Sequence, residues 1–332
     1  MLLAAGNVRA LGSAEPRIRI GEESSSPGPG RRVLSLDGEP AFELSFWCGT
    51  CPFLFQRLDG ASGTVSIDRL QERLTEGLDD LDDEVLDAFG RLLPAGSYLP
   101  LLLGVELRPV SPVRAGDYFA EEQVATWGLN AFWGLPENPR TPYHRTFQTP
   151  VDEGAHLFEF VVPMVPPTWN DVGRVAEFAD VLAASSRPTA VAVATLDVCQ
   201  PAGFSEHPYA HWGLTHFLLD GHHKVQAAAE TGRPLRLLSL LSVEGSLATP
   251  EQVARVPALR ARAAAGRGGG TMSAPGLWWM QKTALPGHSS SHRMVRSPFP
   301  GTLSRVLWNA CAPRWERPAE PRPATRPGRS GR

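Results

Sequence analysis

Two neighbouring stretches in the second half of the chain decide the fold: TAVAVATLDV at residues 189–198 and HFLLDGHHKVQAAAETG at residues 216–232. The first is a run of β-branched and small apolar residues, which is typical of a buried strand. The second passes from an apolar strand through Asp220-Gly221 into a helix predicted over His222–Thr231. Strand, turn and helix in this order predict an α/β fold.

Apolar periodicity predicts further elements on both sides of these stretches. Strands are expected at Val33–Leu36, Phe42–Phe46, 99–107, His156–Pro163, Leu214–Leu219 and Leu235–Val243, and helices from Ser66, from Asp83 and after Trp169-Asn170-Asp171. Asp37-Gly38 joins the first two strands and is a strong hairpin signal. We expect a mixed sheet with flanking helices in the second half, and an α/β elaboration of the same domain in the first half.

Low-complexity composition divides the chain further. Residues 1–31, which contain SSSPGPGRR, and residues 251–332, which are rich in Arg, Pro and Gly, are expected to be largely disordered tails. Residues 32–150 then form the first half and residues 151–250 the second. From Pro257 onward there are 13 basic and 2 acidic residues, whereas the whole chain carries a net charge of −3. This basic tail suggests a nucleic-acid contact, or only a solvated Arg-rich segment.

Length and composition limit the class of protein. The chain has 332 residues, of which 42% are hydrophobic, so it can bury a sizeable core. No apolar run approaches the roughly 18 residues of a membrane-spanning helix, and no secretory signal is recognisable. Four cysteines are too few for a disulfide scaffold of this length. We therefore expect a cytoplasmic protein that does not act in the membrane.

The turn at residues 220–224 is the densest candidate site. Gly221 allows a ligand to approach the backbone, and the helix that follows presents unsatisfied N–H groups that favour an anion. His222, His223 and Lys224 add basic side chains to the first turn, where cations are ordinarily unfavourable. The alternative is structural: one histidine caps or packs, and the lysine is solvated.

The segment LLDGHHKVQAAAETG resembles the glycine-turn motif of the ParB/sulfiredoxin superfamily, and the similarity extends over about residues 170–245. Gly221 matches the turn glycine, and His223 and Lys224 fall where ParB proteins carry arginines that contact nucleotide phosphates. Gln226 replaces a further arginine. His222 stands where sulfiredoxins carry their catalytic cysteine, which argues against sulfiredoxin chemistry. The resemblance implies a pocket for a phosphate-bearing ligand, in particular a nucleotide with Mg²⁺.

Hydrolysis of such a ligand would need an acid and a base. Asp220, His222 and His207 are the candidates, since His207 lies in the loop that precedes the turn strand. His144 and Glu159 are isolated polar residues of the kind that are ordinarily solvated or satisfied. A binding or regulatory module without catalysis is the alternative function.

Cys48-Gly-Thr-Cys51 has redox spacing before a predicted helix, where a thiolate is favoured. Its surroundings resemble a thioredoxin active site only locally, because no βαβ unit precedes it. Zinc is the second hypothesis, with Cys199 and His211 or His207 completing the ligands of Cys48 and Cys51. The third is two buried thiols that pack as small hydrophobic groups.

Overall fold

The computed structural model describes residues 1–23, 31–44, 55–63, 65–112, 114–122, 141–184, 186–199 and 210–266. Its strands are β1 (Leu2–Ala5), β2 (Arg9–Leu11), β3 (Ile18–Glu23), β4 (Arg31–Leu36), β5 (Glu39–Glu43), β6 (Gln56–Arg57), β7 (Gly96–Val105), β8 (Arg108–Val110), β9 (Tyr143–Asp152), β10 (Ala155–Pro163), β11 (Thr189–Cys199), β12 (Ala210–Asp220) and β13 (Leu235–Ser242). The helices are α1 (Gln71–Glu76), α2 (Asp83–Gly90), α4 (Val172–Ala183), α5 (His222–Thr231) and α6 (Pro250–Gly266), with single 3-10 turns η1 (Asp68–Leu70) and η4 (Pro167–Trp169).

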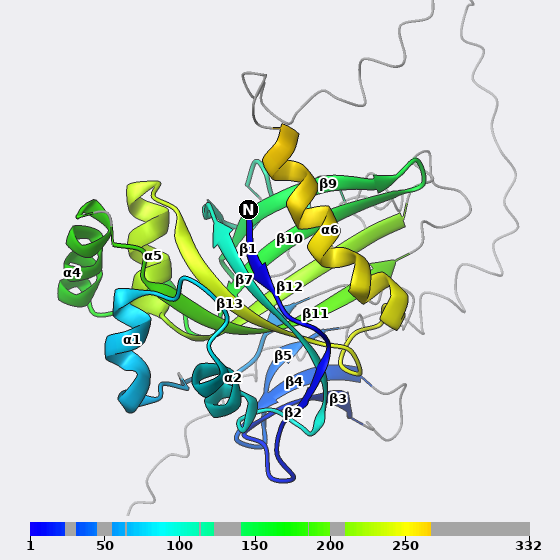
Figure 1. The fold of residues 1–332 in the computed structure, drawn as a ribbon, viewed down its shortest axis with the longest axis horizontal. Coiled ribbons are helices and arrows are strands. Elements are labelled where there is room, and N and C mark those ends of the chain that lie inside the picture. The colour runs from blue at the N-terminus through cyan, green and yellow to red at the C-terminus, as the bar shows by residue number, and fades with distance from the viewer. Residues whose placement is uncertain are drawn as a thin grey trace, which may run out of the picture. The chain divides into compact units, whose positions relative to one another are not determined.

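A nine-stranded mixed sheet forms the centre of the fold (Figure 1). Its strand order is β1-β7-β13-β11-β12-β10-β9-β8, and β2 pairs with a further part of β7. The pairs β10–β12 and β11–β13 are parallel, and the other pairs are antiparallel. The predicted mixed α/β fold is therefore confirmed, including the order β10, α4, β11, β12, α5, β13 in the second half.

Strand β11 shows why both faces of this sheet are covered. Its alanines Ala190, Ala192 and Ala194 join the apolar cluster that α4, α5 and α6 contribute to. Its valines Val191 and Val193 join the opposite cluster, with α1 and α2. Successive side chains of a strand point to opposite faces, so the alternation of Ala and Val gives the sheet two different apolar faces. We call the face with the small side chains the alanine face and the opposite one the valine face.

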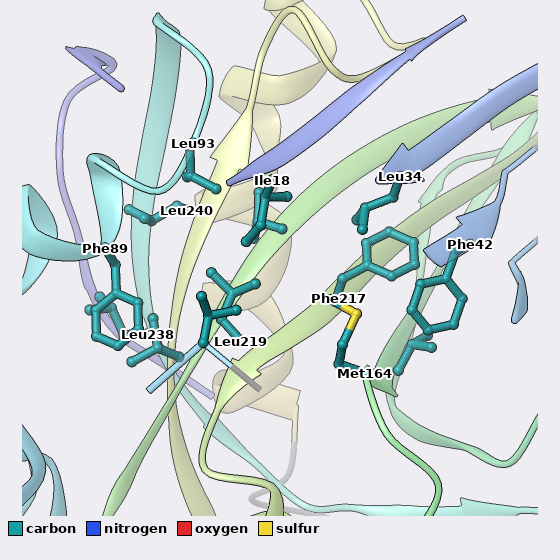
Figure 2. Close-up of a cluster of buried hydrophobic side chains, with 14 of the residues drawn as sticks. Ile18, Leu34, Phe42, Phe89, Leu93, Met164, Phe217, Leu219, Leu238 and Leu240 are labelled. Atoms are coloured by element: carbon teal, nitrogen blue, oxygen red, sulfur yellow. The ribbon is translucent and has the colours of Figure 1, made fainter. Parts of the chain in front are cut away.

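A second sheet, in the order β3-β4-β5-β6, covers part of the valine face. Figure 2 shows Phe217 of β12 beside Leu34 and Phe42 of this small sheet, and the rings of Phe42 and Phe217 lie 5.3 Å apart. The hairpin between β4 and β5 is confirmed: Asp37 and Gly38 both have positive φ, as a two-residue turn requires.

The predicted tails need two corrections. Residues 1–31 were expected to be disordered, but β1, β2 and β3 lie within residues 1–23, and β1 and β2 both pair with β7. Residues 251–266 belong to α6, whose Val253, Val256 and Leu259 are buried in the core. The rest of the C-terminal tail, with its suggested nucleic-acid contact, lies outside the described residues.

The predicted boundary between two halves at residues 150 and 151 falls inside β9, and strands from both sides of it share the central sheet. Smaller differences concern helix starts. Ser66 does not cap a helix, since the 3-10 turn before α1 begins at Asp68. Asp82, not Asp83, caps α2 by accepting a hydrogen bond from the Val85 amide. Of the helices in the described ranges, none is long and apolar enough to cross a membrane.

Candidate functional site

The turn between β12 and α5 has the geometry that its sequence predicts. Gly221 has φ 93°, in the left-handed region, and precedes the first residue of α5. A Cβ atom at Gly221 would lie 2.8 Å from Cβ of Ala190 on β11. The glycine therefore serves both the backbone conformation and the close packing of the helix on the sheet.

We predict that Gly221→Ala lowers the free energy of unfolding by about 2–5 kcal/mol, from strained backbone plus overpacking. Gly232→Ala is the matched control. Gly232 also has positive φ, 64°, but an added Cβ meets nothing within 4 Å. Gly232→Ala should lower the free energy of unfolding only through the backbone strain. Denaturant unfolding measures the loss for both variants. Equal losses would contradict a packing role for Gly221.

Lys224 lies on the buried side of α5. Its side chain is buried, and Nζ donates to the carbonyl oxygens of Thr189 at 3.0 Å and Leu74 at 3.2 Å. Burial lowers the pKa of Lys224 to about 8, although the nearby Asp220 carboxylate opposes this shift. The lysine thus joins α5 to α1 and to the start of β11, so the expectation of a phosphate-neutralising side chain at this position finds no support in its contacts.

The two histidines of the turn act as hydrogen-bond acceptors. Nε2 of His222 accepts a hydrogen bond from the Met164 amide at 3.1 Å, and Nε2 of His223 accepts one from the Asp171 amide at 3.2 Å. Burial, and then the charge of His223, lowers the pKa of His222 to about 3. Because a neutral imidazole has one N–H, the proton of His222 is on Nδ1. Both residues tie the segment before α4 to α5.

Asp220, the predicted acid or base, is also buried. Its Oδ1 accepts a hydrogen bond from Nε2 of Gln71 at 3.1 Å, and its Oδ2 lies 3.8 Å from Nζ of Lys224. This carboxylate stands next to the N-terminus of α5. It puts negative charge where the predicted phosphate would bind.

A pocket of 190 Å³ opens beside this turn, between the edge of the sheet and α5. It is lined by Pro109, His144, Pro163, Pro167, Asn170, His222, Val225, Gln226, Ala229 and Glu230. Strands β8, β9 and β10 supply one wall, and η4 and α5 supply the other. We call it the His144–His222 pocket.

Apolar side chains and neutral imidazoles dominate the lining of this pocket. Burial lowers the pKa of His144 to about 4, so both of its histidines are neutral at physiological pH. Among the described residues that line the pocket there is no lysine or arginine, and the one carboxylate is that of the exposed Glu230. The lining therefore favours a neutral ligand over an anion.

His144 lines the pocket and carries a buried nitrogen atom that lacks a partner. The residue is 7% exposed, and its Nδ1 is buried with no hydrogen-bond partner among the described residues. An unsatisfied buried polar atom costs about 1–3 kcal/mol, and such a group in a pocket is ordinarily paired by a ligand or a water. The interpretation of His144 as a solvated or satisfied residue was wrong. In the sequence, only the strand-like stretch around His144 could have indicated that this residue is buried.

The polar rim of the pocket is ordered by a chain of side chains. Nδ2 of Asn170 donates to Oε1 of Gln226 at 2.7 Å, and Nε2 of Gln226 donates to Oε1 of Glu230 at 2.8 Å. Asp171, at the N-cap of α4, accepts from the Arg174 amide at 2.9 Å, which confirms the predicted helix start. Gln226 thus has a local role in joining Asn170 to Glu230.

Two candidate metal ligands occupy neighbouring strands instead of the expected loop. Cys199 of β11 is buried and lies opposite His211 of β12 in the register. Nδ1 of His211 is 2.6 Å from the Tyr118 hydroxyl. Cys48, Cys51 and His207 lie outside the described residues. Within the described ranges, no group of three His, Cys, Asp or Glu side chains could hold a metal ion, so the zinc and redox hypotheses stay predictions.

Comparison with models of protein families, with curated proteins and with solved structures finds no match to the chain.

Proposed function

We propose that the protein binds a small uncharged molecule in the His144–His222 pocket. The observation that carries this proposal is the mostly apolar surface of the pocket, together with the buried Nδ1 of His144, which has no partner among the described residues. A ligand with an apolar body and one hydrogen-bonding group would cover the proline and alanine surfaces, and would satisfy this atom once the His144 ring turns toward the ligand. This combination of apolar walls and few convergent polar groups is typical of small-molecule sites.

The size of the pocket limits the ligand. An apolar cavity of about 150 Å³ accommodates benzene, whereas drug-sized ligands occupy roughly 300–1,000 Å³. At 190 Å³ the pocket suits a single substituted ring or a branched aliphatic group. Neutral His222 can offer its Nδ1–H, and neutral His144 can offer or accept one hydrogen bond, without bringing charge into the site.

A phosphate-bearing ligand at the turn, and membership of the ParB/sulfiredoxin superfamily, stay predictions. In favour of phosphate is the left-handed Gly221 at the start of α5. Against it are the buried Lys224, which already donates to two carbonyl oxygens, and the carboxylate of Asp220. The contacts of the turn thus support the neutral ligand more strongly.

The test uses phenol as a ring of suitable size with one hydroxyl group. At ten times its Kd, phenol should raise the free energy of unfolding by about 1.4 kcal/mol. Ala229→Leu should abolish this stabilisation, because Ala229 lines the pocket and a leucine there fills it without disfavouring the helix.

The same substitution on another helix is the control. Ala183 is exposed on α4 and does not line the pocket, so Ala183→Leu should keep the phenol effect. Loss of the effect in both variants, or in neither, would refute binding at this pocket.

A further inference from the structure

A chain of hydrogen-bonded polar side chains crosses the alanine face of the sheet, and the proposed function does not use it. The Ser239 hydroxyl of β13 lies 2.7 Å from Nδ1 of His216 on β12. Nε2 of His216 lies 2.9 Å from Oε1 of Glu159 on β10. The other carboxylate oxygen of Glu159 accepts a hydrogen bond at 2.8 Å from Nη1 of Arg260, which lies on α6. All four side chains are at most 1% exposed.

The small side chains of β11 leave room for this arrangement. Ser239 and His216 come from strands on either side of β11, with Ala192 opposite Ser239 and Ala194 opposite His216. Since alanine leaves the space above β11 open, the imidazole can reach across it to the serine. Glu159 lies on the same face, beyond β12, so that three strands align a hydroxyl, an imidazole and a carboxylate.

The hydrogen bonds also define where the protons are. Burial alone would raise the pKa of Glu159, but Arg260 and the hydrogen bond from His216 hold it below its ordinary value. An ionised Glu159 can only accept, so Nε2 of His216 carries a proton. In the neutral ring Nδ1 is then the acceptor for the Ser239 hydroxyl. A hydroxyl bonded to a base that a third group orients is the arrangement of an activated nucleophile.

We propose that Ser239, His216 and Glu159 form a latent serine nucleophile for acyl esters and reactive phosphorus esters, which α6 covers and which is exposed when α6 leaves the sheet. Arg260 of α6 donates a hydrogen bond to Glu159, and Val253, Val256 and Leu259 of α6 belong to the apolar cluster on this face of the sheet. Pro257 lies inside α6 and cannot donate the helical hydrogen bond, which weakens the helix at its middle. Figure 1 shows α6 lying across this sheet.

With an ester, the Ser239 oxygen bonds to the carbonyl carbon and its proton passes to Nδ1 of His216. The C–O bond to the alcohol then breaks, and His216 returns the proton to the departing alcohol. Water attacks the acyl-serine and gives its proton to His216, which passes it to the Ser239 oxygen as the acyl C–O bond breaks, so that the acid and the free serine are released. With a fluorophosphonate, the oxygen bonds to phosphorus, fluoride leaves, and the serine stays modified.

The experiment treats the full chain with a fluorophosphonate and locates the adduct by peptide mapping. We expect a single adduct at Ser239. Ser242 on the same strand is the internal control, because its hydroxyl accepts the Gly245 amide and no histidine contacts it in the described structure. Leu259→Ala should speed the labelling of Ser239 by about tenfold or more, since it loosens α6 without altering the network.

His216→Gln should slow the labelling by about 10²-fold or more, the usual contribution of a general base. Chain unfolded in guanidinium should react only at the background rate of ordinary serines, which keeps the test valid if His216→Gln does not fold. Three outcomes would overturn the proposal: no Ser239 adduct in either folded wild type or folded Leu259→Ala, equal reaction of Ser242, or equal reaction of unfolded chain. None of these outcomes depends on the His144–His222 pocket.

Discussion

Glu159→Gln is expected to lower the free energy of unfolding by about 3–5 kcal/mol, the usual loss when one partner of a buried ion pair is removed. Glu159 is fully buried, and it accepts from Arg260 at 2.8 Å and contacts His216 at 2.9 Å. The variant leaves the Arg260 guanidinium charged and buried without its counter-ion. Denaturant unfolding followed by circular dichroism measures the loss.

Two comparisons make this prediction specific. Asp37→Asn removes the partner of Arg17 in a pair whose side chains are 50% and 47% exposed, and it should cost less than about 1 kcal/mol. The double variant Glu159→Leu with Arg260→Met removes both charges and should recover most of the loss, because buried ion pairs are often replaceable by apolar groups. A loss for Glu159→Gln no larger than for Asp37→Asn would contradict the described network.

Acid is expected to destabilise the protein well above the pKa of ordinary carboxyl groups. Burial lowers the pKa of His144 to about 4 and that of His222 to about 3, both below the unfolded value of 6.5. Below pH 6.5 the unfolded chain therefore binds protons that the folded chain does not. The stability is fully present above that pH and falls as the pH is lowered, by about 2 kcal/mol per histidine at pH 5.

His144→Phe removes the imidazole of His144, leaves that of His222, and keeps a planar side chain of similar shape. The loss of stability between pH 7 and pH 5 should shrink by about 2 kcal/mol in this variant. His156 and His223, whose pKa values are also lowered, remain in both proteins and contribute in the same direction. An unchanged pH profile would mean that His144 is protonated, and therefore solvated, in the folded chain.

The elements that the sequence predicts well are those with strong local signals. Thr189–Cys199 is an uninterrupted β-branched and alanine run, and α5 begins after a turn glycine and ends at Gly232 as expected. Strands β1 and β2 were missed because their pairing partner, β7, is almost a hundred residues away and their own apolar pattern is weak. Pairing at that distance leaves little local signal.

Helix α6 was not predicted because of its amino-acid composition. Its residues ARAAAG looked like the start of a low-complexity tail, although alanine and arginine are good helix formers. A sharper signal was present in Thr249-Pro-Glu-Gln252. The Thr249 hydroxyl accepts the Gln252 amide and the Gln252 side chain accepts the Thr249 amide, which is a capping box with proline in the first helical turn.

The turn and the start of α5 were predicted from the sequence, but the contacts of the side chains in this turn were not. Lys224 lies next to Val225 and one helical turn before Ala228, both buried, so the periodicity of α5 already puts it on the core face. The roles of His222 and His223 depend on amides of Met164 and Asp171, more than 50 residues away. No local pattern reveals such partners. The same holds for His144, which enters the pocket from another strand.

The most direct test of the proposed function compares phenol with phenyl phosphate, two probes that share a ring and differ by the phosphate. The ring resonances of His144 are followed by NMR during titration of the wild-type chain. We predict a saturable shift of His144 with phenol and none with phenyl phosphate, because none of the described residues that line the pocket is a lysine or an arginine. A saturable shift with phenyl phosphate alone would contradict the neutral pocket and favour the phosphate site at Gly221.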